Sequence, residues 1–253
     1  MRPDLIADLF DKEERYWWYV TRRELVIALV RSGSLTGIRS EAGLVLDIGC
    51  GGGYLDKVLE SSDWHVVGVD VSPDALQYCR RRGLQCLCRT DLQRCSLPFK
   101  AESFDMVFAM DVLEHVEDDG HALAECRRVL KDGGLLIVTV PAFMILWSAW
   151  DEACGHRRRY TGRQLARTAA RAELVIVRWT YLFCFVLPAV VAIRLVKHLF
   201  SKDSLQYSTD FVPLPRAVND MLVLLGRLER FLITKLRVKL PFGTSVVSVM
   251  TRK

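Results

Sequence analysis

The sequence predicts a single domain with a doubly wound α/β fold. Short apolar runs alternate with helical stretches along most of the chain, which is the pattern of a parallel sheet covered by helices on both faces. The length of 253 residues and the hydrophobic content of 51% are sufficient for one large domain of this kind. A glycine-rich turn at residues 49–53 directly follows the first apolar run, and this arrangement is typical of a nucleotide-type cofactor pocket.

Seven apolar runs have the length and composition of strands. Most of them are nearly continuous hydrophobic segments, as expected for strands that are buried on both faces. The predicted strands comprise residues 44–48, 65–70, 86–89, 104–110, 135–140, 174–179 and 245–250.

Helices are predicted before and between these strands. They comprise residues 5–32, 54–61, 73–82, 121–130 and 162–172. Pro73 suits the first turn of its helix, and Ser72 is the expected N-cap. The segment Asp132-Gly133-Gly134 is typical of a helix C-terminus and predicts the end of the fourth helix.

A long segment, residues 180–244, separates the sixth strand from the seventh, where a simple sheet needs only a turn. Insertions of this size are usually functional. Residues 181–193 are apolar but too short to span a bilayer, and residues 216–236 form an amphipathic helical pattern. The predicted apolar face of that pattern, opposite Asp220 and Arg227, comprises Val218, Met221, Leu222, Leu225, Leu228, Leu232 and Leu236. The insertion is expected to contact the acceptor, a membrane or a second subunit.

Charge is distributed unevenly along the chain. Residues 1–152 contain 17 Lys and Arg against 25 Asp and Glu, whereas residues 153–253 contain 18 against 5. A basic C-terminal region of this kind either faces an anionic partner or only solvates helices, and the sequence leaves both interpretations open. The eight cysteines form no CxxC pair, and the N-terminus lacks the pattern of a secretory signal. These features predict a reduced, cytoplasmic protein.

The glycine turn differs from the dinucleotide-binding fingerprint. That fingerprint requires a third glycine or alanine where this chain has Tyr54. The sequence therefore argues against NAD or FAD. Asp70, at the end of the second apolar strand and about twenty residues past the turn, is placed to hold the hydroxyl groups of a ribose.

An ordered set of motifs resembles the class I S-adenosylmethionine-dependent methyltransferases. The set spans residues 44–141 and comprises D-x-G-x-G-x-G from Asp47, Gly68-Val69-Asp70-Val71-Ser72, Thr90-Asp91-Leu92, Phe104-Asp105-Met106-Val107 and Val112-Leu113-Glu114-His115-Val116. The resemblance implies a Rossmann-like sheet of seven strands in the order 3-2-1-4-5-7-6, with the last strand antiparallel and the helical insertion between strands 6 and 7.

The resemblance also implies which residues bind S-adenosylmethionine. Asp47 and the backbone of Gly49 and Gly51 would surround the methionine moiety, and Asp70 would accept hydrogen bonds from both ribose hydroxyls. Val71 and Leu92 would pack on the adenine, and Asp91 would accept a hydrogen bond from its amino group. The backbone at Met110, at the end of the fourth strand, would complete the pocket.

In the family that these motifs resemble, an N-terminal helix commonly lies over the cofactor, and the resemblance implies a helical lid of this kind within residues 1–40. Its aromatic run Tyr16-Trp17-Trp18-Tyr19 cannot be buried entirely in one core face, because consecutive helical residues point in different directions. Trp17 and Arg22 are therefore predicted to contact the cofactor. The alternative is a helix that packs on the sheet for structure alone.

Three side chains are candidate catalytic groups. His115 follows the fourth strand, and His156 and Tyr160 lie in the segment after the fifth strand, where the acceptor pocket is usually built in this family. A histidine can remove a proton from an acceptor that is protonated at neutral pH. The alternative for His115 is a structural residue that binds nearby backbone. Residues Arg157 to Arg159 are either a binding site for an anionic acceptor or a solvated loop.

The acidic pair Asp111 and Glu114, followed by His115, is similar to a divalent-cation cluster in some methyltransferases of the quinone pathway and of RNA ends. The Leu-Glu-His segment is also widespread in metal-free relatives. The sequence therefore predicts no metal site.

The sequence as a whole predicts a methyltransferase that acts on a small-molecule or lipid-linked acceptor, with oxygen favoured as the methylated atom. The acceptor is expected to be anionic, with peripheral contact to the inner face of the membrane and a monomeric or homodimeric state. RNA methylation is an alternative that the basic region permits, although no RNA-binding motif supports it and no nucleic-acid partner is expected. A third interpretation is a protein of this fold that uses the cofactor without transferring a methyl group.

Overall fold

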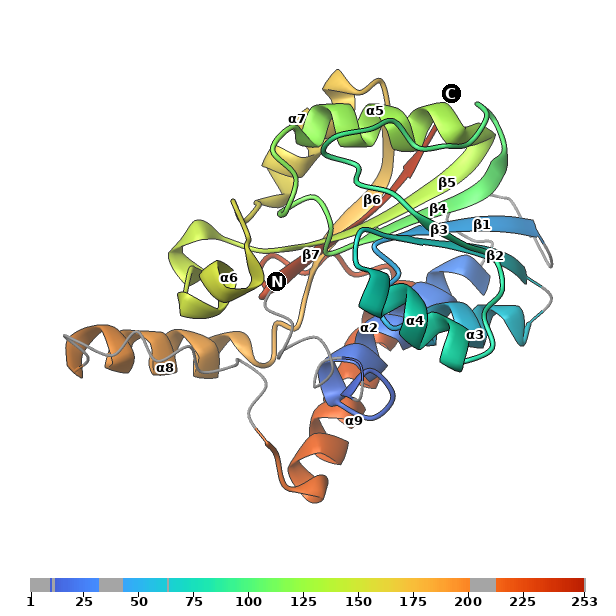
Figure 1. Cartoon of the computed structure of the whole chain (residues 1–253). Helices are drawn as coiled ribbons and strands as arrows, with labels where there is room; N and C mark the ends of the chain where they lie inside the picture. Colours follow the sequence, from blue (N-terminus) through green and yellow to red (C-terminus); the bar gives the residue numbers. More distant parts are fainter. Residues whose placement is uncertain (1–9, 11, 32–42, 63, 201–212, 253) are drawn as a thin grey trace.

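The computed structural model describes residues 10, 12–31, 43–62, 64–200 and 213–252, and within them seven strands form one mixed sheet (Figure 1). The strand order is β3-β2-β1-β4-β5-β7-β6, which confirms the expected topology. Only β7 is antiparallel to its neighbours, β5 and β6. The strands are β1 (Gly43–Ile48), β2 (Trp64–Asp70), β3 (Leu87–Arg89), β4 (Phe104–Met110), β5 (Leu130–Pro141), β6 (Val175–Leu182) and β7 (Ser245–Thr251).

Helices cover both faces of the sheet (Figure 1). Helices α5 and α7 lie on one face, while α3 and α4 lie on the other, where α2 and α9 also pack together. The core between these layers includes the fully buried side chains of Leu46, Phe104 and Phe108. The main helices are α2 (Trp17–Arg31), α3 (Tyr54–Glu60), α4 (Pro73–Arg81), α5 (Asp119–Val129), α6 (Ala149–Cys154), α7 (Gly162–Arg171), α8 (Leu187–Phe200) and α9 (Arg216–Thr234).

Local sequence signals account for several helix starts. The side chain of Ser72 accepts a hydrogen bond from the backbone N–H of Ala75, so the predicted N-cap of α4 is confirmed. Thr161 caps α7 in a capping box with Gln164. These caps place the first residues of both helices within one residue of the prediction.

The N-terminal helix is shorter than expected. Of the predicted range 5–32, residues 5–9, 11 and 32 lie outside the described residues, and a turn at residues 13–15 precedes α2, which begins at Trp17. The cause is Glu13, whose buried carboxylate accepts a hydrogen bond from the Gly52 N–H (2.9 Å) and forms an ion pair with Arg82. This tertiary contact interrupts the helix that the local sequence favours.

The segment Asp132-Gly133-Gly134 does not terminate a helix, contrary to the prediction. Helix α5 ends at Val129, Leu130 already pairs with Phe104, and the next paired residue is Leu135 opposite Met106. The two glycines therefore belong to an irregularity inside β5, where Gly133 has a positive φ of 72°. Strand β6 also extends beyond the prediction, because its last residues pair with the start of β7.

The insertion between β6 and β7 contains α8 and α9, with residues 201–212 outside the described range. Helix α9 packs on α2 through Gly226, at which a Cβ atom would lie 2.2 Å from the Cγ2 of Thr21. Glu229 accepts hydrogen bonds from the backbone N–H groups of Phe183 (2.6 Å) and Cys184 (2.9 Å) just after β6. Several members of the predicted apolar face are instead exposed, including Met221 (52%) and Leu228 (56%).

Among the described residues, none of the helices has both the length and the apolar character needed to cross a bilayer.

Candidate functional site

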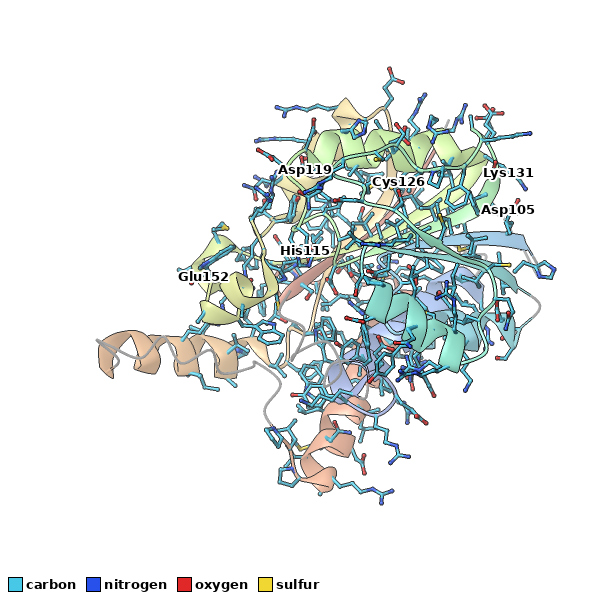
Figure 2. All side chains as sticks on the ribbon, in the orientation of Figure 1. Asp105, His115, Asp119, Cys126, Lys131 and Glu152 are labelled. Atoms are coloured by element: carbon cyan, nitrogen blue, oxygen red, sulfur yellow. The ribbon has the colours of Figure 1, made fainter. Side chains whose placement is uncertain are left out.

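A cavity of about 1280 Å³ lies at the carboxyl ends of the parallel strands. Its wall is formed by the turns after β1, β2 and β4, its roof by α2, and its far end by α6 and α8. Figure 2 labels His115 between the strand ends and α6. Ligands of doubly wound folds bind at this edge of the sheet. All but one of the predicted site residues line the cavity: Trp17, Arg22, Asp47, Gly49, Gly51, Asp70, Val71, Asp91, Leu92, Met110, His115 and His156.

The glycine turn brings backbone directly to the cavity. Gly49 and Gly51 have φ values of 72° and 57°, which other residues adopt only with strain. A Cβ atom at Gly49 would lie 2.6 Å from the Cγ2 atom of Val112. Only glycine therefore fits at the start of the turn.

Asp70 anchors the turn and keeps acceptor capacity for a ligand. One carboxylate oxygen accepts from the Gly51 N–H (3.1 Å) and the other from the Ser72 N–H (2.8 Å). A carboxylate has about four acceptor positions, so two remain for further donors. Burial raises the pKa of Asp70, and the backbone hydrogen bonds partly offset that effect. The position and remaining capacity of this carboxylate suit the two hydroxyl groups of a ribose.

Asp47 places a second, more deeply buried carboxylate in the cavity. Its side chain is 3% exposed. Burial raises its pKa to about 7. Asp56 lies beside it, fully buried, with its own pKa raised by burial and by the charge of Asp47. The two carboxyl groups share a side-chain hydrogen bond, and Asp47 also lines the cavity, where a carboxylate suits an ammonium donor on a ligand.

The remaining residues of the predicted adenine region lie on the same side of the cavity. Val71 is 53% exposed, while Leu92 and Met110 are buried. Asp91 accepts from the Gln93 N–H (3.0 Å) and pairs with Arg94 (3.4 Å). An apolar slot with an acidic rim results, which is suitable for a flat, amino-bearing ring.

Helix α2 covers the cavity and is attached to the insertion. The Trp17 ring packs edge-on against Phe183, with 5.5 Å between ring centroids, and the backbone N–H of Trp17 donates to the side-chain oxygen of Asn219 on α9 (2.9 Å). Arg22 forms an ion pair with Asp111 and lies over the ring of Trp18. The predicted lid helix is thus tied to α9.

Two histidines meet on the side of the cavity opposite the adenine slot. The rings of His115 and His156 are in edge-to-face contact, with centroids 4.8 Å apart. Burial and the neighbouring His156 lower the pKa of His115 to about 4, so its imidazole is neutral near pH 7. His156 Nδ1 lies 2.8 Å from Oδ1 of Asp151, a fully buried carboxylate.

Glu114 lies beside this histidine pair. It is fully buried, and neither carboxylate oxygen has a hydrogen-bond partner among the described residues. Burial raises its pKa to about 8, against the opposing influence of Arg22 and Arg159. The carboxyl group is therefore largely protonated at neutral pH.

Tyr160 is the predicted site residue that the structure does not bring to the cavity wall. Its hydroxyl donates to Asp119 (2.8 Å) and lies 3.2 Å from the carbonyl oxygen of Leu113. Burial and the Asp119 charge raise its pKa. These contacts connect the loop after β5 to α5.

The three consecutive arginines are engaged with the protein itself. Arg157 donates to the carbonyl oxygen of His115 (3.2 Å), Arg158 to that of Glu117 (2.6 Å), and Arg159 to Asp151 (2.8 and 2.9 Å). Arg157 and Arg159 still line the cavity. Of these three arginines, only those two could therefore contact an anionic acceptor in the cavity.

The three residues considered as a cation site, Asp111, Glu114 and His115, do not share one site. Asp111 is occupied by Arg22 and by the hydroxyl of Thr139, whereas one donor atom each from Glu114, His115 and His156 lies within 4.8 Å of the others. The guanidinium charges of Arg22 and Arg159 near Glu114 oppose a further cation there. The absence of a metal stays a prediction.

Sequence reasoning missed Glu13, Asp151 and the environment of Glu114. A partial signal for Asp151 existed, because Ser148 and Asp151 have the spacing of a capping box, which the structure contains. Glu13 carried no local signal, since its partners Gly52 and Arg82 lie far along the chain.

Comparison with known proteins places this geometry in context. Residues 46–138 match the family model described as methyltransferase domain. The chain is 41% identical over 93 residues to the ubiquinone biosynthesis O-methyltransferase of Hahella chejuensis, covering 35% of this chain and 39% of the relative. It is 33% identical over 133 residues to that of Aromatoleum aromaticum, covering 49% and 57%. The matches thus span only about half the length of these curated relatives.

A solved S-adenosylmethionine-dependent methyltransferase from Mesorhizobium loti has the same fold. It superposes with a TM-score of 0.56 at 15% identity, covering 88% of this chain and 98% of that one. At this identity the likeness concerns the fold alone.

Proposed function

Residues 46–138 match a methyltransferase domain, and we propose that the chain is a class I S-adenosylmethionine-dependent methyltransferase that methylates an oxygen atom of an amphipathic small molecule. The proposal rests on one observation: the residues of the cofactor motifs and the two histidines, His115 and His156, line the same cavity. The matched relatives are O-methyltransferases by name, which supports oxygen as the methylated atom.

The residues present fit S-adenosylmethionine. Asp47 lines the cavity beside the glycine turn and suits the ammonium group of the amino-acid moiety, and Asp70 has two acceptor positions for the ribose. When bound, the cofactor supplies an electrophilic methyl group on a sulfonium. The protein contributes alignment and exclusion of water by the α2 lid.

A hydroxyl acceptor must lose its proton as the new bond to carbon forms. His156 lines the cavity with one nitrogen held by Asp151, so the other nitrogen is available to take that proton. His115 is neutral and in contact with His156, and it completes the wall beside the acceptor. We assign Tyr160 a structural role instead, since its hydroxyl is bonded away from the cavity.

The part of the cavity beyond the cofactor motifs is largely apolar, with two cationic residues. This composition supports an acceptor that carries a hydrophobic portion and an anionic or polar group. The residues at this end are Leu146, Trp150, Arg157, Val186, Val190, Ile193, Arg194, Leu214 and Leu222.

The insertion supports contact with an anionic membrane. Met221, Leu224, Leu225, Leu228 and Phe231 form an exposed apolar stripe on α9, and α8 and α9 project from the sheet (Figure 1). Arg216 and Lys235 are exposed near the two ends of this helix, in the basic C-terminal region. An apolar face with flanking basic residues suits an interfacial helix. A lipid-linked acceptor would then enter the cavity beside α8.

Flotation with vesicles rich in phosphatidylglycerol tests this contact. The wild type is expected to float with the vesicles, the double variant Leu224→Ser/Leu228→Ser to lose binding, and the control Val177→Ser on β6 to bind like the wild type. Absence of flotation contradicts membrane contact. A dimer in light scattering that the double variant dissociates would instead identify the stripe as a subunit interface.

The methyl transfer itself is tested by mass spectrometry of S-adenosylhomocysteine and of the methylated product. Purified protein is incubated with S-adenosylmethionine and a series of phenols with alkyl or prenyl tails of increasing length. We expect turnover to increase with tail length and to be lost in Asp70→Ala. Methylation of total RNA with no methylation of any phenol would contradict the proposal, as would cofactor binding without formation of S-adenosylhomocysteine.

A further inference from the structure

The carboxylate of Asp151 has more hydrogen-bond donors than its place in a short helix requires. One oxygen faces His156 Nδ1 (2.8 Å) and Arg159 Nε (2.8 Å), while the other accepts from Arg159 Nη2 (2.9 Å) and from the backbone N–H of Ser148 (2.8 Å). The side chain is fully buried. Hydrogen bonds from His156, Arg159 and Ser148 therefore hold this buried carboxylate in one orientation.

This arrangement determines the tautomer of His156. An ionised carboxylate only accepts hydrogen bonds, and the hydrogen bonds from His156 and Arg159 outweigh burial and hold the pKa of Asp151 well below its usual range. His156 Nδ1 must therefore carry a hydrogen. The lone pair of a neutral imidazole is then on Nε2, the nitrogen that Asp151 does not engage.

We propose that Asp151 is a positioning residue that, together with Arg159, holds His156 in the tautomer and orientation in which Nε2 accepts the acceptor's hydroxyl proton. The inference rests on the proposed function for its chemistry. The O–H bond of the acceptor breaks as its proton moves to Nε2, the electron pair of the oxygen forms the new O–CH₃ bond, and the electrons of the S–CH₃ bond remain on sulfur. The imidazolium produced is stabilised by the adjacent carboxylate.

The neighbouring histidine lacks this support. His115 makes a hydrogen bond with the Gly155 backbone and faces no carboxylate comparable to Asp151 among the described residues in contact with it. The nearest acid, Glu114, is held largely protonated by burial. Of the two imidazoles, His156 is therefore the one built to take up and hold a proton.

Nitrogen NMR of the whole protein labelled at its five histidines tests the tautomer independently of any acceptor. His156→Gln identifies the resonances of His156 by their loss. We expect the wild type to show hydrogen on Nδ1 and a bare Nε2 at neutral pH, and Asp151→Asn to shift the population toward hydrogen on Nε2. The opposite tautomer in the wild type would overturn the proposal, even if the protein proves to be a methyltransferase.

Kinetics then test the role of the arrangement. Asp151→Asn is expected to lower kcat by roughly 10²-fold or more, the scale of general base catalysis, with KM nearly unchanged. The control Glu152→Gln makes the same carboxyl-to-amide change at the next, exposed residue of α6, labelled in Figure 2, and should keep wild-type kcat.

A double-mutant cycle separates positioning from a structural effect, and it remains informative if Asp151→Asn loses stability. If Asp151 acts through His156, the Asp151→Asn/His156→Gln variant has the kcat of His156→Gln alone. Additive losses would overturn the proposal. Abolition of activity by EDTA with recovery on adding Mg²⁺ or Zn²⁺ would also overturn it, since His156 would then bind a metal. Absence of activity in every variant including the wild type, with the expected tautomer present, contradicts only the proposed function.

Discussion

Replacement of Asp70 by alanine should remove most of the affinity for the cofactor product S-adenosylhomocysteine. The carboxylate accepts two backbone N–H groups, from Gly51 (3.1 Å) and Ser72 (2.8 Å), and has two acceptor positions left for the ribose hydroxyls. A hydrogen bond to a charged group contributes about 1.5–3 kcal/mol. Loss of two such bonds predicts about 3–6 kcal/mol, or roughly 10²- to 10⁴-fold weaker binding.

Isothermal titration calorimetry with S-adenosylhomocysteine measures this effect without an acceptor. Asp70→Asn keeps the shape and one acceptor oxygen, so its affinity should lie between those of the wild type and Asp70→Ala. Glu60→Ala, which removes an exposed carboxylate at the end of α3, is the control and should bind within about twofold of the wild type.

The reasoning would be refuted by an unchanged dissociation constant for Asp70→Ala in a protein whose thermal unfolding remains cooperative. A loss of affinity in Asp70→Ala that Glu60→Ala reproduces would also refute it, because the effect would then reflect net charge rather than a specific contact.

Three further predictions concern the surroundings of the cavity. Burial raises the pKa of Glu114 from 4.5 to about 8, so its contribution to the free energy of unfolding is present below pH 4.5 and is lost as the pH rises toward 8. Urea unfolding should show that the decrease in this free energy between pH 5 and pH 8 is smaller in Glu114→Gln than in the wild type by roughly 3–4 kcal/mol. The same dependence on pH in both proteins would contradict the burial argument. Gly226→Ala should destabilise the protein by about 1–3 kcal/mol and weaken S-adenosylhomocysteine binding, because the new Cβ would lie 2.2 Å from the Thr21 methyl. Thr21→Ser removes that methyl but keeps a Cβ 2.8 Å away, so it should restore both properties only in part, and an unchanged double variant would contradict this clash as the main cause. Tyr160→Phe should cost about 1–2 kcal/mol of stability through loss of the hydrogen bond to Asp119 while kcat stays within about threefold, and a much larger fall in kcat would restore Tyr160 as a catalytic candidate.

The cofactor half of the site could be predicted because its residues occur in chain order at strand ends. Asp47 and Asp70 terminate or nearly terminate β1 and β2, and parallel strands bring their carboxyl ends to one edge. The glycine turn must follow β1 directly, since Gly49 and Gly51 need positive φ values. The strand order followed from the family resemblance and was confirmed.

For the part of the cavity that would bind the acceptor, the sequence predicted only which region of the chain forms it. His115 and His156 were identified as candidates, but their contact depends on β5 and α6 folding back to the end of β4. The role of Asp151 depends on its distance of 2.8 Å from His156 and on the Arg159 guanidinium that binds the same carboxylate. The spacing of these residues along the chain does not specify such contacts.

The sequence by itself determined the strands of the sheet, the edge at which the cavity lies and the carboxylates that line it, because apolar periodicity, glycine and strand ends are local properties of the chain. Only the tertiary structure decided which face of α9 is buried and where the N-terminal helix begins. The apolar pattern favoured one face of α9, but close approach at Gly226 and the bonds of Glu229 to free N–H groups after β6 bury another. Glu13 interrupts the helix for the same physical reason: contacts between residues distant in sequence outweigh local preference when they satisfy buried polar groups.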